Sequence, residues 1–240
     1  PFQIFTPSFW VDSSGSNPDA HTIITADQVL RGEYTVAPAA AQFAPGKGYL
    51  WFQQYVEHYC RQLEADGKYA LYLWPYHCQL GSVGHALNGT IQEAVNFFAF
   101  ARSRQTAPQV KGGSPFTENY SVLGPEVQVA QDGTSVGQAN TRFIDTLLSA
   151  DTVTIAGQAA SHCVKSTIDD LLSQIQAKDP ELAKKVYIVR DCMSAVVIPG
   201  GGPDLDYTDR ANQALDRFAD AGMHVVESTT PMTNWPDFKA

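Results

Sequence analysis

Cys163 is the residue whose type and setting most plainly offer chemistry. A β-branched run ends at Ile155, Gly157 and several small or polar residues follow, and an amphipathic stretch begins at the cysteine. This pattern predicts a strand, a tight turn and a helix, with the thiol in the first helical turn. The unpaired N–H groups there and the positive end of the helix dipole favour a thiolate, which is the nucleophilic form of cysteine. A lone cysteine is more often buried and inert, so its surroundings must decide.

The composition describes an ordinary globular protein and excludes several functions. The chain has 240 residues, 44% of them hydrophobic and 17% charged, which is enough for one large domain with a substantial core. Its net charge of −9 argues against a surface that binds nucleic acid or anionic membranes. No run of 18 apolar residues occurs, so the sequence predicts no membrane span.

The four cysteines fit neither a zinc finger nor a dense disulfide framework. They stand at positions 60, 78, 163 and 192, without metal-ligand spacing. A reducing cytoplasm is therefore the expected location.

Helical and extended patterns alternate along most of the chain. Helices are expected over residues 50–65, 88–104, 141–150, 163–176 and 208–221, and strands over 69–74, 152–156, 186–189 and 224–227. Residues 1–50 are rich in loops and show no core strand, although Thr25 to Val29 has the pattern of a capped turn.

This alternation predicts an α/β fold with a mostly parallel sheet between two helical layers, a three-layer α/β/α sandwich of Rossmann-like type. We expect a single domain over 1–240, with 1–50 packed on it. Ligands of such sheets bind at the carboxyl ends of the strands, where the loops after Trp74, Ala156 and Val189 are expected to meet.

Three blocks, in this order along the chain, resemble the isochorismatase-like cysteine hydrolases, a family that includes the nicotinamidases. The first runs Trp74-Pro75-Tyr76-His77-Cys78-Gln79-Leu80-Gly81, and the second consists of Lys111 followed by Tyr120-Ser121. The third is Gly157-x-Ala159-x-x-x-Cys163-Val164-Lys165-x-Thr167. Together they span roughly residues 69–195.

The resemblance implies an Asp–Lys–Cys triad, of which two members are found. Cys163 would be the nucleophile, and Lys111 would stabilise its thiolate. The oxyanion hole would consist of the N–H groups of Cys163 and Ala159, the latter following a cis peptide bond after Gln158. Tyr120, His162 and Trp74 are expected to contact the substrate.

The third triad member, an aspartate on the first strand, is not found. Asp12, Asp19 and Asp27 all lie in polar loop context. The residues from Phe2 to Trp10 resemble the region after the family's second strand, so we expect that the first strand is absent and that another segment or chain supplies the aspartate. The family's Asp-His-His metal site would lie there too. We therefore expect no cofactor or metal in this chain, and a zinc-type metal only if an upstream site exists.

Several of these residues have simpler interpretations. A single lysine such as Lys111 is usually solvated, although Gly112-Gly113 follows it in a loop. His77 and Cys78 are read as structural residues buried at a strand end rather than metal ligands, and Asp191 as a contact at the end of the sheet. His162 is expected to line the site rather than transfer a proton.

The expected function is hydrolysis of a C–N amide bond in a small molecule, as in nicotinamidases, through a Cys163 acyl-thioester. One alternative is the isochorismatase reaction, in which a vinyl ether is cleaved. The other is a catalytically silent binding protein on the same fold. The family also implies a homo-oligomer.

Overall fold

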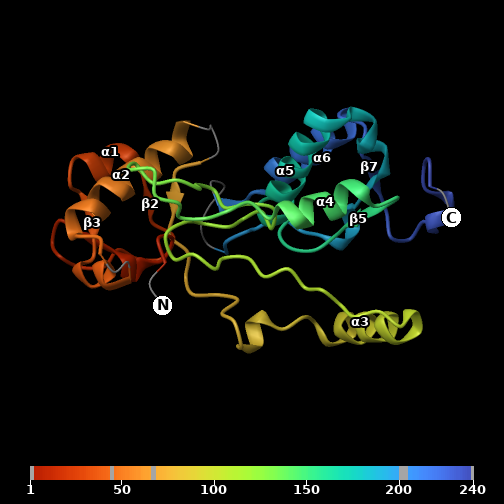
Figure 1. The fold of residues 1–240 in the computed structure, drawn as a ribbon, viewed down its shortest axis with the longest axis horizontal. Coiled ribbons are helices and arrows are strands. Elements are labelled where there is room, and N and C mark those ends of the chain that lie inside the picture. Colours follow the sequence, from red (N-terminus) through yellow and green to blue (C-terminus); the bar gives the residue numbers. More distant parts are fainter. Residues whose placement is uncertain (1–2, 44–45, 66–68, 200–204, 239–240) are drawn as a thin grey trace. The chain divides into compact units, whose positions relative to one another are not determined.

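The computed structural model describes residues 3–43, 46–65, 69–199 and 205–238, and these form two compact units. Unit 1 consists of residues 1–118 and 129–136, and unit 2 of residues 119–128 and 137–240. Each unit is described by itself (Figure 1). The expected single domain over 1–240 stays a prediction.

Unit 1 contains three helices and two small antiparallel ladders among its described residues. The helices are α1 (Ala26–Leu30), α2 (Tyr49–Ala65) and α3 (Gly89–Arg102), with 3-10 turns η1 (Pro7–Phe9), η2 (Pro38–Phe43) and η3 (Val83–His85). Strand β1 (Trp10–Asp12) pairs with β3 (Tyr34–Val36), and β2 (Ile23–Ile24) pairs with β4 (Leu71–Tyr72).

Local sequence explains the helices of unit 1. The Thr25 hydroxyl accepts the Gln28 N–H while the Gln28 side chain accepts the Thr25 N–H, a reciprocal cap that starts α1. Helix α2 buries Phe52, Tyr55 and Tyr59 on one face, as its spacing predicts. The predicted helix over 88–104 is confirmed, and it ends at Ser103 in a left-handed conformation (φ 50°).

The strand expected over 69–74 departs from the prediction. It shortens to Leu71–Tyr72 and pairs antiparallel with β2, so its expected place in the parallel sheet is wrong. The cause lies in its partners, since the Leu73 N–H bonds to the Thr22 carbonyl and the Trp74 N–H to that of Phe5. The amino-terminal segment thus takes the hydrogen bonds that a parallel neighbour would have used.

Unit 2 has the α/β fold that the sequence predicted. Strands β5 (Val153–Ile155), β6 (Val186–Val189) and β7 (His224–Val226) form a parallel sheet in that order. The helices are α4 (Thr141–Ser149), α5 (Cys163–Lys178) and α6 (Thr208–Asp220), joined by the 3-10 turns η4 (Pro180–Lys185), η5 (Arg190–Cys192) and η7 (Met232–Asn234). Figure 1 shows α5 and α6 side by side next to these strands.

The central strand β6 is buried on both faces. Val186 and Ile188 pack into the core cluster that α4, α5 and α6 share, whereas Tyr187 and Val189 join a second cluster with Val226 and Trp235. Alternate residues of a strand point to opposite faces, so this division follows from the pleat. Helices therefore cover one face, and the carboxyl-terminal segment around η7 covers the other.

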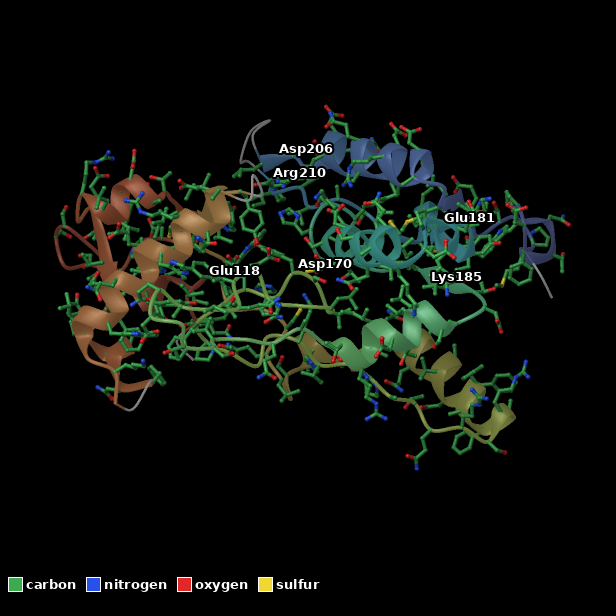
Figure 2. All side chains as sticks on the ribbon, turned by 45° about the horizontal axis from the view of Figure 1, so that its top comes forward. Glu118, Asp170, Glu181, Lys185, Asp206 and Arg210 are labelled. Atoms are coloured by element: carbon green, nitrogen blue, oxygen red, sulfur yellow. The ribbon has the colours of Figure 1, made fainter. Side chains whose placement is uncertain are left out.

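Polar contacts hold the ends of the helices in unit 2. Lys185, on η4 near Glu181 in Figure 2, donates its Nζ to the carbonyls of Leu148 and Ala150 (2.5 and 2.7 Å) and so caps the end of α4. Asp206 Oδ1 accepts the Thr208 N–H at the start of α6 (2.9 Å). Among the described residues, no helix has both the length and the hydropathy to cross a membrane.

Candidate functional site

The turn between β5 and α5 lies at the carboxyl edge of the parallel sheet. Gly157 adopts φ 121°, which favours glycine, and the Gln158–Ala159 peptide bond is cis, as the resemblance implied. The N–H groups of Gly157 and Ala160 bond to the carbonyls of Cys192 and Ser194 (3.1 and 2.8 Å). The loops after β5 and β6, two of the three that were predicted to do so, therefore meet at one edge. The loop after Trp74 belongs to unit 1.

Cys163 is the first residue of α5 and is half-buried. The Ala159 carbonyl accepts the N–H groups of His162 and Val164 (3.0 and 3.1 Å), which closes the turn below the thiol. Thr167 Oγ1 donates to the Cys163 carbonyl (2.8 Å). The two N–H groups expected to form the oxyanion hole, of Ala159 and Cys163, thus belong to one tightly bonded turn.

Tyr120 reaches this turn through a contact of its own segment with α5. The Val122 N–H donates to Thr167 Oγ1 (3.2 Å), and Ser121 is buried. The ring centroid of Tyr120 consequently lies 5.7 Å from that of His162.

The imidazole of His162 contacts two tyrosine rings, those of Tyr120 and Tyr207. Tyr207 meets it edge to face at 4.7 Å, on the side of the site formed by the start of α6. The Ser161 hydroxyl lies 2.8 Å from Nδ1 of His162, and it also accepts the N–H of Val196 (2.9 Å). These contacts fix the plane of the ring.

His162 is neutral at physiological pH. Its burial, followed by the positive charges of Arg210 and Lys165, lowers its pKa to about 4. Arg210 lies on the first turns of α6, next to Asp206 in Figure 2. The site therefore combines a thiol, a neutral imidazole and two phenol rings.

The residues predicted for the site divide between the two units. Cys163, Ala159, His162 and Tyr120 all belong to unit 2 and come together at the β5–α5 turn. Lys111 and Trp74 belong to unit 1, so their roles beside the thiol stay predictions. Lys111 is exposed in an irregular stretch before Glu118.

Other expectations can be checked directly. Asp191 accepts both the N–H and the hydroxyl of Ser228 (2.8 and 2.6 Å), so it is the sheet-end contact that was predicted. His77 and Cys78 are exposed, which shows that their predicted burial was wrong because the loop after β4 does not cover them. The described residues contain no group of three or more His, Cys, Asp and Glu side chains that could hold a metal ion.

Sequence reasoning missed Ser161, Tyr207 and Arg210. Ser161 is adjacent to His162 in the chain, so a search for hydroxyl–imidazole pairs could have found it. Tyr207 and Arg210 lie more than 40 residues from Cys163, and only the packing of α6 brings them to the site.

No family model and no curated protein matches this chain. Among solved structures, it is similar to the yeast nicotinamidase Pnc1p (20% identity, TM-score 0.40) and to PnC1 from L. infantum in complex with nicotinate (23%, 0.41). The matches cover 66% and 65% of this chain, but only 60% and 61% of those two proteins.

A zinc complex of the pyrazinamidase from Pyrococcus horikoshii matches over 94% of this chain and 96% of its own, at 15% identity and a TM-score of 0.37. The expected absence of a first strand finds no support in these comparisons. Likeness at these identities concerns at most the fold, so the function must come from the site.

Proposed function

We propose that this chain is a cysteine hydrolase of the isochorismatase-like family that cleaves the amide bond of a small molecule, as nicotinamidases do. The observation that carries the proposal is the half-buried Cys163 thiol at the start of α5, on the carboxyl edge of a parallel sheet. Helix starts favour the thiolate, and this edge is where α/β sheets bind ligands.

The reaction follows from nucleophilic catalysis. The thiolate sulfur attacks the carbonyl carbon, a C–S bond forms, and the carbonyl oxygen becomes an oxyanion. The C–N bond then breaks, and the nitrogen leaves as ammonia or an amine, carrying the proton that the thiol gave up when it ionised. Water attacks the acyl-thioester, releases the carboxylic acid and restores the thiol.

The surrounding groups suit this reaction. The N–H groups of Ala159 and Cys163 would donate to the oxyanion, because both lie on the turn that carries the thiol. Lys111 would hold the thiolate by its positive charge. Tyr120, His162 and Trp74 would contact the substrate, and the Tyr120, His162 and Tyr207 rings suit a flat aromatic amide.

Alkylation with iodoacetamide near pH 6, followed by mass spectrometry, tests the nucleophile. Cys78 and Cys192 are exposed and Cys60 is buried, so the chain carries its own reference thiols. We expect the half-buried Cys163 to react faster than both exposed cysteines, which accessibility alone would not produce. Equal or slower labelling of Cys163 would support the silent binding protein instead.

Activity completes the test. We expect release of ammonia from at least one of nicotinamide, benzamide and isobutyramide, and its loss in Cys163→Ala. Turnover of isochorismate without amide cleavage would assign the vinyl-ether reaction. Cytoplasmic location, a homo-oligomer and the lack of a cofactor stay predictions.

A further inference from the structure

Backbone hydrogen bonds join the β5–α5 turn to the loop that follows β6. The N–H groups of Gly157 and Ala160 donate to the carbonyls of Cys192 and Ser194 (3.1 and 2.8 Å). Both donors belong to the turn, and both acceptors belong to residues 192–196, which we call the brace. Because neither peptide group can rotate without breaking its bond, the brace fixes the path of the turn between its two donors.

Ser161 adds a side-chain bond to this arrangement. Its hydroxyl oxygen accepts the N–H of Val196, the last residue of the brace (2.9 Å), and Ser161 is only 2% exposed. The Val196 carbonyl in turn accepts the N–H of Tyr207 at the start of α6 (3.0 Å). The Ser161 hydroxyl therefore connects the turn, through the brace, to α6. Its removal would take from the Val196 N–H the acceptor that this geometry provides.

The turn that these bonds hold carries Ala159, a proposed donor to the oxyanion. Ala159 directly precedes the bonded Ala160, and its own carbonyl accepts the N–H groups of His162 and Val164 (3.0 and 3.1 Å). An oxyanion hole is effective only when its donors already point to the developing charge, because reorientation during the reaction would consume the energy gained. A turn fixed from both sides meets this requirement.

We propose that Ser161 is a positioning residue, whose bond to Val196 holds the turn on the brace and thereby keeps the Ala159 N–H in place for the oxyanion. This inference rests on the proposed function. In this role Ser161 contacts no substrate and transfers no proton. Its hydroxyl matters for steps that form an oxyanion, and it does not matter for the reactivity of the Cys163 sulfur.

Two reactions of Cys163 separate these effects. An aldehyde adds to the thiol: a C–S bond forms, the carbonyl becomes a C–O single bond, and its oxygen lies where the oxyanion would lie or takes the thiol proton there. Iodoacetamide forms its C–S bond at a saturated carbon and releases iodide, so no oxyanion arises. Aldehyde binding therefore reports on the oxyanion hole, whereas alkylation reports on the thiolate.

Three substitutions of Ser161 test the role of its hydroxyl. Threonine and valine have nearly the same shape, so comparing Ser161→Thr with Ser161→Val isolates the hydroxyl at equal volume. Ser161→Ala removes the hydroxyl without adding atoms. Ser173→Ala removes an exposed hydroxyl farther along α5, which donates to the Asp169 carbonyl, and serves as the control.

The probe is nicotinaldehyde, benzaldehyde or isobutyraldehyde, matched to the amide that the wild type cleaves fastest. We expect the inhibition constant of the aldehyde to rise about tenfold and kcat to fall by a similar factor, the value of one hydrogen bond. These changes should appear in Ser161→Ala against the wild type and in Ser161→Val against Ser161→Thr. KM and the alkylation rate of Cys163 should stay within about twofold, because the lost contact is made only after attack.

The possible failures are distinguishable. A wild type that neither cleaves an amide nor binds the aldehyde overturns the proposed function, and this inference with it. An active wild type overturns this inference alone if Ser161→Val and Ser161→Thr bind the aldehyde equally tightly. So does a parallel loss of aldehyde binding and alkylation, which would show that Ser161 acts on the thiolate or on the whole fold.

One measurement needs no variant. In the wild type, the Val196 N–H should exchange slowly with deuterium, because a hydrogen-bonded amide must open before it exchanges. Exchange at the rate of an unstructured peptide would remove the bond on which the inference rests.

Discussion

Thr167 ties the nucleophile's own backbone to a distant segment, since its Oγ1 donates to the Cys163 carbonyl at 2.8 Å while accepting the Val122 N–H at 3.2 Å. One hydroxyl thus joins the first turn of α5 to the segment that carries Tyr120. The position of the aromatic side of the site relative to the thiol depends on this link.

Thr167→Val should weaken both the fold and the site. The substitution keeps the shape of the side chain but leaves the Val122 N–H without its acceptor, so we expect a loss of about 1–2 kcal/mol in the free energy of unfolding. Urea denaturation measures this loss. Thr167→Ser keeps the hydroxyl and should lie close to the wild type. A stable Thr167→Val beside a destabilised Thr167→Ser would show that the methyl group matters instead.

Lys111→Ala tests the second member of the proposed triad. Removing the ammonium group should slow iodoacetamide labelling of Cys163 and lower kcat/KM by about 100-fold, because the thiolate loses a stabilising charge. Lys178→Ala, at the last turn of α5, removes an equal charge far along the helix from Cys163 and serves as the control. Full activity in Lys111→Ala would remove Lys111 from the mechanism.

His162 should make the stability of unit 2 depend on pH. Burial, with Arg210 and Lys165 next, lowers its pKa from 6.5 to about 4. Between these values the unfolded chain binds a proton that the folded chain does not, so the free energy of unfolding must fall as the pH falls. Because of this group, we expect the free energy of unfolding to fall by up to about 3 kcal/mol between pH 7 and pH 4.

Urea unfolding at several pH values compares the wild type with His162→Gln. In the variant, the part of the pH dependence of the unfolding free energy that comes from His162 should vanish. His77→Gln replaces an exposed imidazole by the same side chain and serves as the matched control. If His162→Gln and the wild type respond to pH alike, then the imidazole is not held neutral by the fold.

Trp235 should be essential for the sheet although it lies outside it. Its ring stacks on Tyr187 of the central strand (5.3 Å, 24°) and is 7% exposed. Trp235→Ala would uncover that face of β6, and we expect the free energy of unfolding to fall by about 3 kcal/mol or more. Thermal unfolding of Trp235→Ala checks this, with Trp235→Phe, which keeps a flat ring, as the control. If Trp235→Ala unfolds at the same midpoint temperature as the wild type, the carboxyl-terminal segment does not stabilise the sheet.

Local pattern determined most elements of unit 2 and the place of the nucleophile. The β-branched runs form β5 and β6, and the amphipathic stretch from Cys163 forms α5. Both could be predicted because the spacing of apolar residues shows which face of an element is buried. The same rules found the helices of the amino-terminal part but not its strands β1, β2 and β3. Strands such as β1 and β2 have two or three residues, too few for alternation to be visible.

Other features were decided only when distant segments met. The predicted strand around Leu71 changed its partner because Thr22 and Phe5 offered carbonyls to the residues after it. Likewise, the sequence placed a histidine beside the thiol, but the lowered pKa of that histidine comes from its burial and from the positive charges of Arg210 and Lys165. Residue type is set by the chain alone, whereas protonation follows from the dielectric and the charges that packing brings around a group.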